Sequence, residues 1–244
     1  MESYTGFSKI YDKLIMEDVD YDAFASFILS MKQKGRSYLD AACGTGNISL
    51  RIAPHFRDTT LIDLSEDMLT LAVQKLDSLG IRTRAYSIPM EDMQFEESFS
   101  LITSVLDSVN YLTEHGQAEK FFKAAYDHLE EGGLFVFDIN SSYKLTEILG
   151  DNDYVYTSDD IVYTWENSLE DGIVEMYLNF FIREGKHYER VEELHHEKVF
   201  SELELIDILH RTGFEDIETW DSYSEKRPDE ETERITFTAW KRRK

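Results

Sequence analysis

The chain has 244 residues, of which 42% are hydrophobic, and its 49 acidic and 25 basic side chains give a formal net charge of −24 at pH 7. This length and hydrophobic content predict one sizeable domain with an insertion and exclude global disorder. The acidic balance argues against a nucleic-acid partner, because such binding uses Lys and Arg to neutralise phosphates, and the single cysteine, Cys43, excludes an internal disulfide.

The sequence also lacks the features of a membrane or secreted protein. No apolar run approaches the length of a membrane span. The first residues, MESYTGF, have neither the basic n-region nor the apolar h-region of a secretory signal. We therefore expect a cytoplasmic protein with no membrane partner, and the sequence gives no indication of its oligomeric state.

The first segment has the periodicity of a helical leader. From Tyr4 to Lys34 apolar residues recur every three to four positions, and Gly35 ends the pattern. Packing against a core is sufficient to explain most of these residues.

A short apolar segment then runs into a loop of small residues, SYLDAACGTGN, over 37–47. Tyr38 and Leu39 begin a buried strand that Asp40 closes, and the residues after it are small enough for a ligand to approach the backbone. The helix expected from Asn47 to Ile52 completes a strand, a tight turn and a helix N-terminus. This arrangement is the first third of a nucleotide-binding βαβ unit.

The next strand, Thr59 to Ile62, ends at Asp63, where a carboxylate can accept hydrogen bonds from both hydroxyls of a ribose. Folds that bind NAD and folds that bind S-adenosylmethionine both have an acidic residue at this strand end. The loop lacks two glycines of the dinucleotide pattern G-x-G-x-x-G, and Asp40 beside it suits a cation better than a pyrophosphate. An NAD-dependent oxidoreductase remains the alternative.

Two runs, LDAACGTG and IDLSEDM, resemble the first motif and the ribose-binding motif of the class I S-adenosylmethionine-dependent methyltransferases. The resemblance covers most of the chain and implies a set of residues that bind the cofactor. These are Asp40, Ala41, Ala42, Gly44, Gly46, Asn47, Asp63, Leu64 and Met68. The run FSKIYDKLIM also resembles the leader of a group of bacterial small-molecule methyltransferases, in which it folds over the cofactor, and this implies a cofactor contact from Tyr11.

Ser65 is expected to cap a helix that Leu79 and Gly80 end, and a third strand is expected over Arg82 to Ile88. The run Glu91-Asp92-Met93 follows. In the resembled family an acid here contacts the adenine amino group and the next backbone N–H meets the ring. The resemblance therefore implies Asp92 and Met93 as cofactor residues, with Glu91 as the alternative to Asp92.

The fourth strand, Ser98 to Leu106, is followed by DSVNYL, the run that most specifically resembles the same bacterial group. The resemblance implies Asp107 as a cofactor residue and Asn110 and Tyr111 as acceptor residues. An amphipathic helix over Glu114 to Leu129, ended by Gly132 and Gly133, and a fifth strand, Leu134 to Asp138, then complete a parallel core.

After Gly150 the periodicity changes to alternation. Segments 161–165, 174–182 and 187–200, separated by the turns Asp171-Gly172 and Glu184-Gly185, predict antiparallel strands. A helix capped by Ser201 and Glu204 and closed by Gly213 follows, and the last strands are expected over 214–220 and 234–240. A helix before such a pair resembles the antiparallel end of a class I methyltransferase sheet.

Glu193, His195 and Glu197 lie two apart on one of these strands and share a face, which suits acid/base chemistry. A solvated polar face is an equal alternative, and ligation of Zn or Fe is a minor one because no second histidine shares the face. The segment E-x-H-x-E-K-x-F is similar to a segment of the same bacterial group. We expect His195 to be catalytic, either as a base or as an orienter, with Glu193 and His195 at the acceptor and no metal.

The predicted fold is therefore α/β, with a Rossmann-like class I methyltransferase core: a mostly parallel seven-stranded sheet with an antiparallel last strand. Residues 1–35 form a helical leader, 36–150 the cofactor-binding core, 151–200 an antiparallel β insertion on the acceptor side, and 201–244 complete the sheet. The predicted function is methyl transfer from S-adenosylmethionine to a small-molecule acceptor. An NAD-dependent oxidoreductase and a non-catalytic S-adenosylmethionine-binding module are the alternatives.

Overall fold

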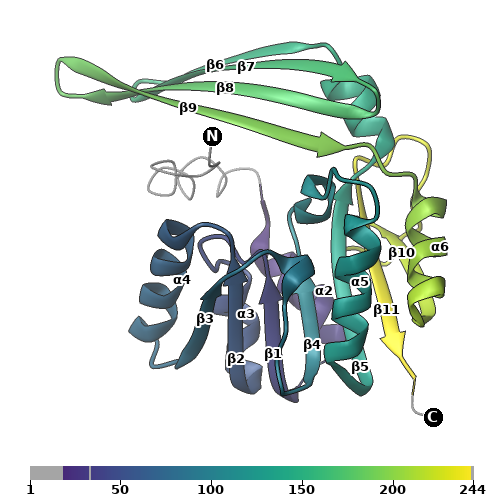
Figure 1. The fold of residues 1–244 in the computed structure, drawn as a ribbon. Helices are drawn as coiled ribbons and strands as arrows, with labels where there is room; N and C mark the ends of the chain where they lie inside the picture. Colours follow the sequence, from purple (N-terminus) through teal and green to yellow (C-terminus); the bar gives the residue numbers. More distant parts are fainter. Residues whose placement is uncertain (1–18, 33, 243–244) are drawn as a thin grey trace.

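The computed structural model describes residues 19–32 and 34–242, which form a core sheet and a second sheet above it (Figure 1). Within these residues the core sheet has seven strands in the order β10-β11-β5-β4-β1-β2-β3. β11 is antiparallel to both of its neighbours, and the other pairs are parallel. The strands are β1 (Gly35–Ala41), β2 (Phe56–Asp63), β3 (Thr83–Ser87), β4 (Phe99–Ser104), β5 (Leu129–Asn140), β10 (Glu215–Asp221) and β11 (Arg234–Lys241).

Helices cover both faces of this sheet because the central strands are apolar on both sides. In β1, Tyr38 packs with α2 (Tyr21–Met31), α3 (Ser49–Ile52) and α4 (Glu66–Ser78), whereas its neighbour Leu39 packs with α5 (Gln117–His128) and α6 (Glu202–Thr212). The alternation along a strand thus divides the core into two layers. The predicted Rossmann-like class I fold is confirmed.

The predicted insertion forms an antiparallel sheet in the order β6-β7-β8-β9. Its strands are β6 (Asp153–Thr157), β7 (Ile161–Glu170), β8 (Ile173–Glu184) and β9 (His187–Lys198), and the π-helical turn η4 (Lys144–Leu149) joins it to β5. The sheet extends across the carboxyl ends of the parallel strands (Figure 1). Asp171 and Gly172 both have positive φ, as the predicted two-residue hairpin turn requires.

The helix caps agree with the sequence, since Ser65 accepts the N–H of Met68 and Ser201 accepts that of Glu204. The predicted glycine end of α5 is wrong. The helix ends at His128, and Gly133 lies inside β5, where a Cβ would stand 2.8 Å from the carbonyl oxygen of Glu130. The same Cβ would stand 3.2 Å from the carbonyl oxygen of Phe99, so this glycine permits a close approach of β4 and a local bend in β5.

Candidate active site

The loop after β1 uses its two glycines for different purposes. Gly44 has φ +53, and a Cβ there would meet nothing within 4 Å. Gly46 has φ +78, and a Cβ there would stand 2.9 Å from the Cβ of Ala72 in α4. Gly46 therefore allows the helix to pack against the loop, whereas Gly44 leaves space beside the backbone.

The carboxylate of Asp63, at the end of β2, binds this loop to the start of α4. Its Oδ2 accepts the backbone N–H of Gly44 at 2.8 Å, and its Oδ1 accepts that of Ser65 at 2.9 Å. Burial raises the pKa of the carboxyl, although the backbone N–H groups oppose the shift. Since a carboxylate offers about four acceptor positions, Asp63 retains capacity for further donors such as ribose hydroxyls.

A cavity of ≈ 760 Å³ opens beside Gly44 and Asp63 at the carboxyl ends of β1, β2 and β4. Seven residues of the predicted site lie on its wall: Ala42, Gly44, Asn47, Asp63, Leu64, Met68 and Tyr111. Leu64 is 70% exposed, so it presents an apolar surface to the cavity mouth. The wall also carries three further acids, Glu66, Asp67 and Glu91.

Asp40 lies beneath this loop and is not on the cavity wall. It is fully buried, and its carboxylate accepts hydrogen bonds from the hydroxyls of Ser49 and Thr103. Burial raises the pKa of Asp40 to about 6, against the lowering effect of these hydroxyls. Its contacts connect β1 to α3 and β4, so Asp40 fixes the elements on which the loop stands. Ala41, fully buried beside it, also lies outside the wall.

The structure places Glu91, rather than Asp92, on the cavity wall. Gln117 of α5 donates to the Glu91 carboxylate at 2.5 Å. The Asp92 side chain is half exposed, pairs with Lys120, and borders a separate hollow of ≈ 410 Å³. Met93 is buried in the core. A cofactor role for Asp92 and Met93 thus stays a prediction, and Glu91 has the better position.

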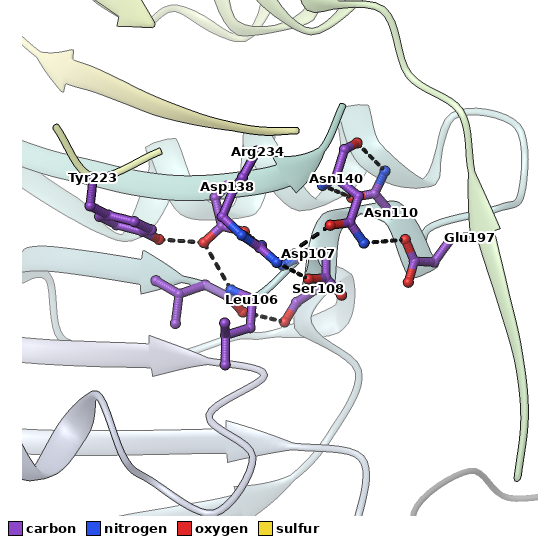
Figure 2. Close-up of polar contacts among 10 residues, drawn as sticks. Leu106, Asp107, Ser108, Asn110, Asp138, Asn140, Glu197, Tyr223 and Arg234 are labelled. Carbon is purple, nitrogen blue, oxygen red and sulfur yellow. Dashed lines mark hydrogen bonds and ion pairs between the residues drawn. The ribbon is translucent and has the colours of Figure 1, made fainter. Parts of the chain in front are cut away.

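Asp107 belongs to a buried polar network at the carboxyl ends of β4 and β5 (Figure 2). Leu106 and Asp107 have φ of +57 and +54, and their N–H groups both donate to the Asp138 carboxylate, at 2.8 and 2.7 Å. Arg234 of β11 bridges Asp107 and Asp138, and the hydroxyl of Tyr223 also donates to Asp138. The network holds a strained turn against the cavity, where Leu106 and Ser108 line the wall.

Asn110, predicted at the acceptor, lies behind the cavity wall. Its side chain donates to the carbonyl oxygens of Asn140 and Lys198 at 3.2 and 3.0 Å and accepts the N–H of Asn140 at 3.0 Å. The amide is therefore occupied by backbone groups. It ties the core to β9, so its assignment to the acceptor stays a prediction.

The polar face of β9 is buried, not solvated. Glu193, His195 and Glu197 are only 3%, 6% and 3% exposed. Glu197 accepts a hydrogen bond from the side-chain amide of Asn140 at 2.8 Å (Figure 2). Burial, aided by the negative charge of Asp107, raises the pKa of Glu197 to about 8, and burial lowers that of His195 to about 4.

His195 connects the insertion to the cavity. Its Nδ1 lies 3.1 Å from the hydroxyl of Tyr111, which lines the cavity, and its Nε2 lies 4.0 Å from Oε2 of Glu193. The rings of Tyr111 and His195 are perpendicular, with their centroids 5.8 Å apart. Tyr11, the last residue of the predicted site, lies outside the described residues.

The sequence interpretation did not identify Asp138, Asn140, Tyr223 or Arg234. Asp138 closes the apolar run LFVFD as Asp40 closes its own strand, and that signal was available. Nothing local marks Arg234, because its partners are 96 and 127 positions away. In the described part of the chain, no group of three or more His, Cys, Asp or Glu side chains could hold a metal, and no helix could span a membrane.

Comparisons with known proteins agree on the family. Residues 39–133 match the model of a methyltransferase domain. A protein of Geobacillus sp. (strain WCH70), named as a methyltransferase, is 34% identical over 98% of this chain and all of its own length. The crystal structure of an S-adenosylmethionine-dependent methyltransferase from Clostridium acetobutylicum is 40% identical, covers 98% of this chain and 99% of its own, and superimposes with a TM-score of 0.92.

A third relative is more distant. It is the Streptomyces venezuelae dTDP-3-amino-3,4,6-trideoxy-alpha-D-glucopyranose N,N-dimethyltransferase, 28% identical over 80% of both chains. The site itself fits the cofactor that these enzymes share, since Gly44 leaves room beside the loop and Asp63 has acceptor capacity for a ribose. The chain belongs to the class I S-adenosylmethionine-dependent methyltransferases, and S-adenosylmethionine is its cofactor.

Proposed function

We propose that the protein transfers a methyl group to a small-molecule acceptor bound between the cavity and the inner face of β9. The observation that carries this proposal is the contact between Tyr111 and His195. Tyr111 stands on the cavity wall and His195 on the insertion, so this contact joins the wall of the cofactor cavity to the insertion. An acceptor here would lie close to both elements.

The chain's own residues supply mainly positioning. S-adenosylmethionine, when bound, supplies a methyl group that is already activated by its sulfonium. Asp63 would hold the ribose hydroxyls, and Leu64 would offer an apolar surface to the base. Holding an acceptor in line with the methyl group and excluding water can lower the barrier by roughly 7 to 11 kcal/mol.

The charges of the wall support a neutral or cationic acceptor. Among the described residues that line the cavity, the charged side chains are Asp63, Glu66, Asp67 and Glu91, all acidic. These carboxylates would repel phosphates and attract an amine. The acidic balance of the whole chain likewise supports a small molecule rather than nucleic acid. The Streptomyces venezuelae relative is named for an amino sugar, which supports a small-molecule acceptor.

Each segment of the chain would have its own role in this reaction. Residues 1–35 act as a leader over the site, 36–150 hold the cofactor, 151–200 face the acceptor, and 201–244 complete the sheet. A cytoplasmic location stays a prediction from the sequence.

Incubation with a bacterial metabolite extract and methyl-labelled S-adenosylmethionine, followed by mass spectrometry, tests the function. At a cofactor concentration near the wild-type Kd, we expect at least one small molecule to gain the label with the wild-type protein and much less label to appear with Asp63→Ala. Label that appears only at an acceptor-independent background, with normal cofactor binding, would instead indicate a non-catalytic binding module.

A further inference from the structure

Tyr111 and His195 differ in their access to the cavity. Tyr111 ends the short helix η3 (Ser108–Tyr111), and its side chain lines the cavity. His195 is buried and is not among the lining residues, so its imidazole lies behind the phenol, with Nδ1 3.1 Å from the hydroxyl. A molecule in the cavity therefore meets the hydroxyl of Tyr111 before the imidazole.

Glu193 lies on the other side of the imidazole. Its Oε2 is 4.0 Å from Nε2 of His195, and both side chains are buried on one face of β9. Their cross-strand partners on β8 are Leu178 and Met176, which are apolar. Glu193 is beyond hydrogen-bond distance of Nε2, but a negative charge on that side of the ring favours the tautomer with the proton on Nε2. In this tautomer Nδ1 faces the Tyr111 hydroxyl with its lone pair and can accept the phenolic proton.

We propose that Tyr111, His195 and Glu193 form a proton relay in which Tyr111 is the catalytic residue that touches the acceptor. His195 and Glu193 are positioning residues that act through it. The same order of groups occurs in catalytic triads, in which a base activates a hydroxyl or thiol and a third group orients the base. Here the phenol takes the place of the hydroxyl, the imidazole is the base, and the carboxylate orients it. This inference rests on the proposed function and names the base of the same site.

The nucleophilic atom of the acceptor forms a bond to the methyl carbon while the carbon–sulfur bond breaks, and the electron pair of that bond stays on sulfur. The acceptor's proton moves to Oη of Tyr111 as the phenolic proton moves to Nδ1 of His195. The imidazolium then faces the Glu193 carboxylate, and the proton later leaves to solvent.

The surroundings of His195 keep it neutral before the reaction. Burial lowers the pKa of its imidazole to about 4, and His196 acts in the same direction, whereas the negative charge of Asp107 opposes the shift. Among the residues that the structure describes, the titratable side chains of Glu193 and Tyr111 also lie beside the ring. A neutral ring at physiological pH can accept a proton, and the proton of the acceptor becomes acidic as the new bond forms.

Nitrogen NMR on the full-length protein, labelled with ¹⁵N in histidine, tests the relay without any acceptor. We expect His195 to carry its proton on Nε2 at pH 7, and we expect Tyr111→Phe to shift the Nδ1 resonance. The matched variant Tyr177→Phe, whose hydroxyl contacts Glu192 on the same sheet, should leave that resonance unchanged. A proton on Nδ1 would overturn the relay, because the imidazole would then donate to Tyr111.

Turnover supplies the second test, with the metabolite extract and methyl-labelled S-adenosylmethionine as the probe. Tyr111→Phe and His195→Ala should each lower the rate of methylation by about 100-fold, and the double variant should lose little more. Cofactor affinity should stay within a few-fold in each. His196→Ala, an exposed neighbour on the opposite face, should methylate at the wild-type rate.

The results of these experiments distinguish failure of the relay from failure of the proposed function. Wild-type rates in Tyr111→Phe, combined with a large loss in His195→Ala, would overturn the relay while methyl transfer stands. Absence of any labelled product with wild-type protein that binds the cofactor would overturn the proposed function, and the relay with it.

Discussion

The carboxylate of Asp63 accepts the backbone N–H of Gly44 at 2.8 Å, so the residue that would hold the ribose also fixes the glycine that leaves room for the ligand. One side chain thus organises two strand ends. Loss of this carboxylate should therefore remove an acceptor for the ribose and also release the loop at Gly44.

Asp63→Ala should weaken S-adenosylmethionine binding by at least tenfold, since each charge-assisted hydrogen bond contributes roughly 1.5 to 3 kcal/mol. Isothermal titration calorimetry measures this directly. Asp58→Ala, an exposed acid on the same strand, is the matched control and should bind normally. Equal affinity in the two variants would remove Asp63 from the site.

Gly44→Ala should abolish or severely weaken cofactor binding while the protein remains folded. Gly44 and Gly172 both have positive φ, and at both a Cβ meets nothing within 4 Å, so alanine costs each roughly 1 to 2 kcal/mol of backbone strain. Only Gly44 lines the cavity. Thermal unfolding should therefore show similar losses in the two variants, whereas calorimetry should show a binding defect in Gly44→Ala alone. Normal binding by that variant would contradict a close approach of the ligand.

Arg234→Met should lower the free energy of unfolding by about 3 to 5 kcal/mol, because it leaves the Asp107 and Asp138 carboxylates without their cation. Arg211→Met is the control, because Arg211 pairs with Glu119 and Asp207 at exposed positions, where such pairs contribute at most about 1 kcal/mol. Urea denaturation distinguishes them, and losses of similar size would show that the buried network is not a major source of stability.

Glu197→Gln should change how stability depends on pH. The folded state raises the pKa of Glu197 from 4.5 to about 8, so the wild-type protein binds this proton more tightly when folded and loses stability as pH rises through this interval. Asp107 favours the neutral form, whereas Asn140, Lys144 and Arg234 oppose it. Glutamine keeps an acceptor for Asn140 and does not ionise. As pH rises, the free energy of unfolding of the variant should therefore increase relative to that of the wild type by at most about 1.4 kcal/mol per pH unit.

Denaturation curves from pH 5 to pH 9 test this expectation. Glu192→Gln, an exposed neighbour on the other face of β9, should follow the wild-type profile. Parallel profiles for the wild type and Glu197→Gln would mean that Glu197 is ionised in the folded protein throughout this range.

The order of the elements was predictable from the sequence because it depends on local patterns. Alternation over Val174 to Ile182 predicted an antiparallel strand, and the capping pattern at Ser201 predicted a helix start. β6 was missed, and all five of its residues are exposed, so no buried face appears in its sequence. Gly133 was taken for a helix end because a glycine in sequence does not reveal which backbone approaches it.

The site was predictable only in part because several of its features depend on contacts between distant segments. Asp63 and Gly44 were placed by the strand ends on which they lie. The choice between Glu91 and Asp92 depends on the orientation of a short 3-10 helix, η2 (Met90–Asp92), which no periodicity encodes. Alternation placed Glu193 and His195 on a common face but could not show that Tyr111 meets that face.

The pairing of Arg234 with Asp107 joins residues 127 positions apart, and this separation has a consequence for the order of events during synthesis. The ribosome makes β4, β5 and the turn at Leu106 long before it makes β11. Until Arg234 emerges, Asp107 and Asp138 lack the guanidinium that bridges them in the folded protein. We therefore expect the turn on the cavity wall to reach its final geometry only after β11 has paired with β5, so that the site matures later than the strands that carry it.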